Sequence, residues 1–302
     1  MLSTAFIQQG TWATKDTTEI FLSEFKQLDV NRGKTEKTIR NFITETASLF
    51  SLLETSQGES RAGRNAIMLA ENQHLPDFFL RFLSRFQFPG GHVKDRYNAD
   101  LVQNKIEFKP AKFLVELILS GHKHEMNRSR RAFGISAMEA TWFALNDLLA
   151  LQGKRKPEEN ALRLIKYREQ GLEPELPDLE IYKLPKGIAT APGDFVRYSR
   201  DCLNWLSHAR VLIQSDGRWY LRSGSTDRIN YLLDDDSFFD HYSNVPLENF
   251  PQIKDSWLSF ANDFSSSPVP KLAESFEERS LIEIPRVRET SLDLVIDEIS
   301  LH

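Results

Sequence analysis

The chain has 302 residues, enough for about two domains of roughly 150 residues each and for a substantial core. Hydrophobic residues make up 40% and charged residues 27%, and 38 Lys and Arg against 43 Asp and Glu give a net charge of −5. This composition is typical of a globular protein and excludes a disordered chain, a collagen-like chain and a wholly basic nucleic-acid coat. The longest apolar runs fall far short of the ~20 residues that a membrane-spanning helix needs.

The net charge is distributed unevenly. Residues 1–222 carry 32 basic and 27 acidic side chains, whereas residues 223–302 carry 6 basic and 16 acidic ones. The single cysteine, Cys202, excludes an intramolecular disulfide and a Cys-based zinc site. The first residues have neither the basic nor the apolar region of a secretory signal, so we predict a cytoplasmic protein.

Apolar residues at helical spacing predict four helices in the first part of the chain. Turn chemistry separates the first two at Asp29–Lys34, and Ser56, Gln57 and Gly58 predict a further turn. Pro89, Gly90 and Gly91 stop the last of the four, because proline cannot continue a helix. The predicted helices are 16–28, 35–53, 64–72 and 76–86.

A long polar loop is expected after Gly91, followed by helices over 110–120, 136–149 and 158–170. The second of these begins with a capping box, Ser136 at the cap and Glu139 three residues later. A proline-rich connector covers 173–192.

The next segment predicts a helix over 194–208 and then a β-hairpin. Asp216-Gly217 between alternating apolar residues is a strong hairpin signal. A short helix over 226–233 follows.

Groups of helices followed by a hairpin predict a mainly α fold with small β-hairpin wings (α+β), built of tandem winged-helix or helix-turn-helix subdomains. The expected units are a first winged-helix subdomain over 1–90 and a second helical or winged-helix subdomain over 91–184. A further winged segment with the hairpin is expected over 185–250, and an acidic tail or linker over 251–302.

The stretch 60–92, which begins SRAGRNAIML and ends FQFPGGH, resembles the first recognition subdomain of type IIS restriction endonucleases and related nicking enzymes. The resemblance continues in order through IEFKPAKFLVELIL at 106–119, a helix opened by Ile135-Ser136, and the helix and hairpin of 194–222. It covers roughly residues 5–235.

The resemblance implies a DNA-recognition module whose winged-helix subdomains read an asymmetric site as a monomer. In that family the nuclease domain, of the PD-(D/E)xK type and dependent on Mg²⁺, is a separate unit C-terminal to the recognition region. The chain departs from this pattern because it ends at His302. We therefore expect no cofactor for recognition itself, and a nuclease domain or partner subunit reached through the acidic tail.

Basic and amide side chains beside predicted helix starts are the candidate DNA-binding residues. Arginine and lysine neutralise backbone phosphates, helix N-termini attract them, and arginine and asparagine also pair with guanine and adenine edges. The candidates are Arg32, Lys34, Lys37, Arg40, Asn41, His92, Lys94, Arg96, Asn98, Asn127, Arg128, Ser129, Arg130, Arg131, Arg197 and Arg200.

Two groups offer alternatives with metal chemistry. Asp100, Glu107 and Lys109 have the residue types of a Mg²⁺-dependent nuclease centre, but Lys109 precedes Pro110 at a helix entry, which makes them weak catalytic candidates. His122, His124 and Glu125 could ligate a metal. A solvated loop is the favoured interpretation of that segment, so no metal site is predicted.

The leading hypothesis is therefore a sequence-specific double-stranded DNA recognition module of a type II (IIS-like) restriction endonuclease. A non-nuclease DNA-binding regulator or defence-system adaptor is the alternative, and a Mg²⁺-dependent nuclease within this chain is the third. Selection of bound duplexes from a random pool and a test for DNA cleavage with Mg²⁺ distinguish these three hypotheses.

Overall fold

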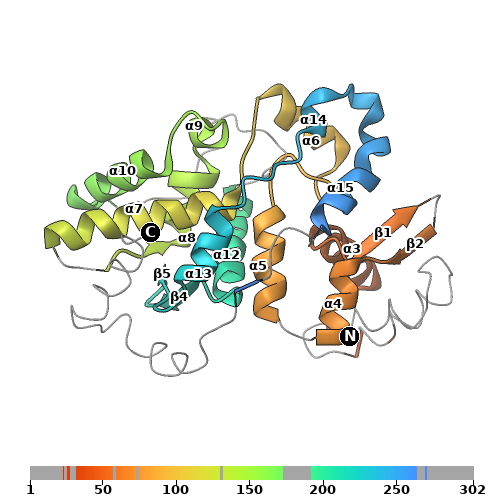
Figure 1. The fold of residues 1–302 in the computed structure, drawn as a ribbon, viewed down its shortest axis with the longest axis horizontal. Helices are drawn as coiled ribbons and strands as arrows, with labels where there is room; N and C mark the ends of the chain where they lie inside the picture. Colours follow the sequence, from red (N-terminus) through yellow and green to blue (C-terminus); the bar gives the residue numbers. More distant parts are fainter. Residues whose placement is uncertain are drawn as a thin grey trace.

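The structure is a computed structural model that describes residues 23, 26, 27, 32–56, 59–72, 75–129, 132–172, 192–263, 269 and 270. The ribbon in Figure 1 shows helices and two small sheets, and it confirms the predicted mainly α fold of the α+β type. Within the described residues, no helix combines the length and the apolar character that crossing a membrane requires.

The first half of the described chain contains helices and one hairpin. The predicted helices 64–72 and 76–86 are confirmed to within one residue at each end, and the first of the four lies almost wholly outside the described residues. The elements are α3 (Glu36–Leu49), β1 (Leu53–Ser56), β2 (Glu59–Ala62), α4 (Arg64–Asn72), α5 (Leu75–Arg85), α6 (Asp95–Gln103) and α7 (Pro110–Ser129).

The second half contains the larger sheet. Its elements are β3 (Ile135–Ser136), α8 (Ala137–Ala140), the π-helix η2 (Thr141–Leu145), α9 (Leu148–Leu151), α10 (Pro157–Glu169), α12 (Pro192–His208), β4 (Leu212–Ser215), β5 (Arg218–Leu221), α13 (Thr226–Leu233), α14 (His241–Asn244), the 3₁₀-helix η3 (Leu247–Ile253) and α15 (Lys254–Ala261).

Both sheets are antiparallel. One contains only β1 and β2, and the other has the strand order β3-β5-β4, so the predicted hairpin carries a third strand from far earlier in the chain. The main core joins α5, α7, η2, α10, α12 and this larger sheet, with Leu114, Leu164 and Leu206 fully buried. The predicted subdomain limits at 90 and 184 stay predictions, and packing contacts cross both.

The helix expected over 35–53 ends at Leu49, and Leu53 already belongs to the strand β1. Three further predictions of local structure are wrong. The expected polar loop after Gly91 contains the helix α6. The helix expected to end at Ser120 continues to Ser129, so His122, His124 and Glu125 lie in α7 and not in a loop.

The third error concerns the helix expected over 136–149. Its capping box is present, with Ser136 and Glu139 bonded reciprocally. The helix nevertheless breaks after Leu145, because Asp147 begins a new helix by accepting from the backbone N–H groups of Leu149 and Ala150.

The unit formed by α12 and its hairpin has a counterpart in α3 and β1–β2. Each helix is followed by three residues and then by two four-residue strands. Ser51 and Arg210, at the same place in the two connections, both have positive φ, 51° and 59°.

The backbone hydrogen bonds of the two connections match one for one. The N–H of Leu52 donates to the carbonyl of Ala47 at 2.9 Å, and that of Val211 donates to Leu206 at 3.0 Å. The N–H of the residue after each hairpin donates to the carbonyl of the residue before that hairpin, Gly63 to Leu52 at 2.9 Å and Arg222 to Val211 at 3.0 Å. The chain therefore contains one helix–hairpin unit twice.

The chain after the second hairpin belongs to the fold at least as far as Asp263. A second core cluster includes Phe239, Tyr242 and Trp257, and it packs against α6. The part of the predicted acidic tail before residue 264 thus contains packed helices, while the segment 271–302 lies outside the described residues.

Candidate nucleic-acid interface

The helix α12 presents a polar face opposite its core face. Phe195, Leu203 and Leu206 are fully buried, whereas Arg197 and Arg200 are exposed three residues apart. The Arg197 side chain is 61% exposed, lies 3.4 Å from Asp194 and stacks 4.8 Å from the ring centroid of Tyr198. These contacts hold the guanidinium near the surface, where it remains accessible to a partner.

The hairpin after α12 projects a tight turn. Asp216 and Gly217 have φ values of 49° and 74°, the double left-handed conformation of a type I′ turn, which asparagine, aspartate and glycine favour. Asp216 and Gly217 are both exposed. The predicted hairpin is therefore present, directly after the helix that carries Arg197 and Arg200.

Exposed basic residues lie just before and at the start of helix α3 of the other unit. Arg32, Lys34 and Lys37 are all exposed. Thr35 caps the helix by accepting from the Thr38 N–H at 3.2 Å. Arg40 and Asn41 belong to α3, but their side chains lie outside what the structure describes.

The segment from His92 to Asn98 divides into exposed and buried candidates. Lys94 and Arg96 are exposed. Asn98 is fully buried, and its amide donates to the Gly90 carbonyl at 2.9 Å and accepts from the Gly90 N–H at 3.2 Å. Asn98 thus fixes the turn before α6, and its amide is occupied by the protein itself.

The ring of His92 faces an aromatic cluster. Its centroid lies 4.8 Å from that of Phe86 and 6.0 Å from that of Trp257, and both of its nitrogens are buried without a hydrogen-bond partner. Burial lowers the pKa of His92 to about 3. A neutral, enclosed imidazole packs the core, so we leave His92 and Asn98 out of the proposed contact surface.

The candidates Asn127, Arg128 and Ser129 form the last turn of α7 and are exposed. The helix capped at Ser136 is present as predicted, but the segment expected to lead into it belongs in part to the C-terminal end of α7. Arg128 is paired with Glu169 of α10. Arg130 and Arg131 lie outside the described residues.

The weak nuclease candidates do not form a described metal site. The described residues contain no group of three or more His, Cys, Asp or Glu side chains that could hold a metal. Lys109 donates to the carbonyls of Asp235 and Ser237 at 2.8 and 3.0 Å and lies 3.9 Å from the Asp235 carboxylate. Burial lowers its pKa to about 8, partly offset by Asp235. Its role in the structure is to anchor the chain after α13, while Glu107 is exposed and Asp100 accepts from Asn104.

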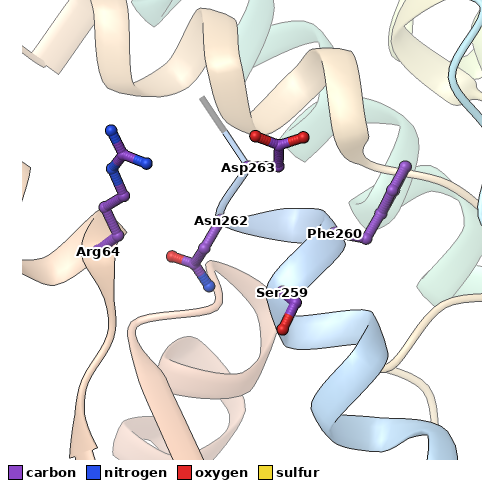
Figure 2. A pocket seen from close by; sticks show the side chains of 5 residues that line it. All are labelled: Arg64, Ser259, Phe260, Asn262 and Asp263. Atoms are coloured by element: carbon purple, nitrogen blue, oxygen red, sulfur yellow. The ribbon is translucent and has the colours of Figure 1, made fainter. Parts of the chain in front are cut away.

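A groove of about 490 Å³ lies between the start of α4 and the end of α15. Figure 2 shows Arg64 on one side and the α15 residues Ser259 and Phe260, followed by Asn262 and Asp263, on the other. Asn262 is buried and ties the two elements together. The groove is open and mixed in polarity, so we assign it no ligand.

Comparison with known proteins identifies the family. The family model described as restriction endonuclease BpuJI, N-terminal, matches residues 4–258. The chain therefore belongs to this family, in agreement with the resemblance to restriction endonucleases noted in the sequence. No curated protein sequence matches the chain.

A solved structure has the same fold. It is the crystal structure of pyrene- and phenanthrene-modified DNA in complex with the BpuJ1 endonuclease binding domain. The TM-score is 0.72 and the sequence identity 18%, over 87% of this chain and 90% of the other.

Sequence reasoning missed two arginines beside the second hairpin. Arg168 of α10 and Arg218 of β5 are partly exposed and both bind Glu139. Their positions in the sequence gave no signal, because α10, β5 and the capping box are brought together only by tertiary packing.

Proposed function

We propose that this chain is a sequence-specific double-stranded DNA recognition module of a restriction endonuclease. The observation that carries the proposal is the repeated helix–hairpin unit in a chain of this family. A helix with an exposed polar face can enter the major groove, and a β-ribbon can contact the same or the neighbouring groove. Two such units of different sequence would read two unlike parts of one site, which suits an asymmetric site and a monomer.

The proposed contact surface combines residues of α12, of the start of α3 and the segment before it, and of the start of α6. It comprises Arg32, Lys34, Lys37, Lys94, Arg96, Arg197 and Arg200, each with a described and exposed side chain. Their charges would supply the salt-dependent backbone contacts, while the arginines can also read guanine. Arg40, Asn41, Arg130 and Arg131 remain candidates from sequence. The net charge of −5 is compatible with this role, because only the contacting face has to be positive.

Cleavage, on this proposal, is supplied by a separate nuclease domain or subunit, and Mg²⁺ is required only there. The anchoring of Lys109 by carbonyl groups supports a chain without a catalytic centre among its described residues. Plasmid DNA incubated with the chain and Mg²⁺ should remain uncut. Specific cutting by this chain alone would overturn the non-catalytic part of the proposal.

Selection of bound duplexes from a random pool tests the recognition part. We expect enrichment of one short asymmetric motif. Arg200→Gln should weaken binding to the selected duplex by a factor of roughly 10 or more if the guanidinium reads a base. A matched control is Arg163→Gln, an exposed arginine on α10 that is paired with Asp147. A pool without an enriched motif would exclude sequence-specific recognition.

A further inference from the structure

Glu139 is a buried carboxylate held between two arginines, one of them at the turn end of the β4–β5 hairpin. Its side chain is 3% exposed. Arg168 donates from Nε and Nη2 to its two oxygens at 2.8 and 2.9 Å, and Arg218 donates from Nη1 at 2.7 Å. The Ser136 N–H adds a fourth donor at 2.8 Å. The carboxylate therefore fixes both guanidinium groups in position.

The two arginines keep donors that the protein does not use. Their side chains are 28% and 38% exposed, and their other hydrogen bonds within the described chain go to the Gly134 carbonyl. Nη1 of Arg168 and Nε and Nη2 of Arg218 have no hydrogen-bond partner among the described residues, and none of these atoms is buried. The group has two positive charges against one negative charge, and its unused N–H groups reach solvent.

The pair lies at the second hairpin, whose β-ribbon the proposed function brings to a DNA groove. Arg218 is the first residue of β5, directly after the exposed turn of the hairpin, and is paired in register with Ser136 of β3. Arg168 is held in place by its contact with Glu139 and by the ring of Phe133, 4.6 Å away. The hairpin is attached to the main core by its buried side chains Leu212, Trp219 and Leu221, and the bonds of Arg218 to Glu139 and Gly134 add polar contacts at its turn end.

We propose that Arg168 and Arg218 form a binding site for a DNA backbone phosphate, with Glu139 as the positioning residue that orients them. The inference rests on the proposed function and adds a contact that the sequence did not indicate. Guanidinium groups bind phosphate oxygens through paired N–H donors, and orientation in advance reduces the entropy lost on binding. A phosphate contact positions the duplex and carries no base information.

A second cluster in the same domain offers a matched control. Asp147 is 5% exposed, is paired with Arg155 and Arg163, and accepts from two backbone N–H groups. It belongs to α9 and α10 and has no contact of this kind with a strand of the hairpin. The two clusters therefore have the same chemistry and differ in whether they adjoin the hairpin.

The test measures binding of a short fluorescent mixed-sequence duplex over a series of salt concentrations. We expect Arg218→Gln and Arg168→Gln each to lower affinity by a factor of about 3–10 at moderate salt, and to reduce the salt slope by up to about 0.9 for the lost phosphate contact. Arg155→Gln and Arg163→Gln should leave both quantities unchanged. Equal effects of the two pairs of arginine variants on affinity and salt slope would overturn the proposed phosphate site.

Glu139→Gln separates positioning from simple charge. If the arginines acted only through net charge, removing the carboxylate would strengthen binding of the duplex. If Glu139 orients them, the variant should bind severalfold more weakly while Asp147→Asn binds like the unchanged chain. Stronger binding by Glu139→Gln would therefore refute the positioning role.

Two further measurements keep the test decisive. Melting curves establish that each variant is folded at the assay temperature, and Arg218→Lys, which keeps the charge but not the paired donors, should show an intermediate loss. If the unchanged chain bound no duplex at any salt concentration, the proposed function would fail. If it bound and the four arginine variants behaved alike, only the phosphate site would fail.

Discussion

The amide of Asn262 connects the end of α15 to the first helix–hairpin unit, and its removal gives a quantitative test of how the domain is held together (Figure 2). Its Oδ1 accepts from the Asn65 N–H at 2.9 Å, and its Nδ2 donates to the Leu258 and Ser51 carbonyls at 2.9 and 3.3 Å. Asn65 lies in the first turn of α4, so the contact acts as a helix cap supplied from far along the chain.

The cost of Asn262→Ala follows from these three bonds. Loss of a helix-capping acceptor costs about 0.5–2 kcal/mol, and a buried carbonyl left without its donor adds about 1 kcal/mol. We expect a loss of roughly 1.5–3 kcal/mol in the free energy of unfolding. At about 2–4 °C per kcal/mol, this corresponds to a fall in Tm of about 3–12 °C.

Thermal unfolding followed by circular dichroism measures this loss. Asn262→Asp keeps the acceptor for Asn65 but loses both donors, so its Tm should lie between those of Asn262→Ala and the unchanged chain. Asn244→Ala is the control, because that exposed amide bonds only the Asp240 carbonyl within the described chain and should cost no more than about 0.5 kcal/mol. If Asn262→Ala had the same Tm as Asn244→Ala, the stability of the second core cluster would not depend on this cap.

Three further predictions concern acid stability, packing and reactivity. Burial alone would raise the pKa of Glu139 and of Asp147, but hydrogen bonds and charge from their arginine partners outweigh it and hold both below the ordinary value. A carboxyl group whose pKa is lowered in the folded state stabilises the protein at pH values above its pKa in the unfolded state, near 4, and this stability is lost as the pH falls through the folded-state pKa. The fall in Tm from pH 7 to pH 3 should therefore be smaller in Glu139→Gln and Asp147→Asn than in the unchanged chain. In Gly121→Ala the new Cβ would lie 2.3 Å from Phe133 Cε1, so urea unfolding should show a loss of about 1–3 kcal/mol, and a neutral result would mean that the ring moves aside freely. The Cys202 thiol is buried with a raised pKa, so a thiol reagent should label it only as fast as the chain unfolds, and prompt labelling of the native protein would contradict its burial.

Local sequence signals determined much of the secondary structure. The Ser136–Glu139 capping box, the Asp216-Gly217 turn and the helix over 194–208 are present as predicted, because each depends on residues close together in the chain. The resemblance to restriction endonucleases also agrees with the family that the chain belongs to. The exposure of Arg197 and Arg200 followed from the same helical periodicity.

Other features were decided by contacts between distant segments. The amide of Asn98 has the chemistry of a base-reading group, but its position beside Gly90 gives it a structural role. Polar residues over 92–105 predicted a loop, whereas packing of α6 against the second core cluster makes the segment helical. The sequence alone did not predict this helix, because its packing partners in the second core cluster lie far away along the chain.

The repeat is the clearest case. The two helix–hairpin units share the turn patterns Ser56-Gln57-Gly58 and Ser215-Asp216-Gly217 but few other identities, so the sequence determined two hairpin-compatible segments without showing that they are equivalent. Their equivalence appears in backbone hydrogen bonds and in the positive φ of Ser51 and Arg210, which many side chains can accompany. Tertiary structure likewise brought Arg168 and Arg218 to one carboxylate, since burying Glu139 requires charge partners from whichever elements pack around it.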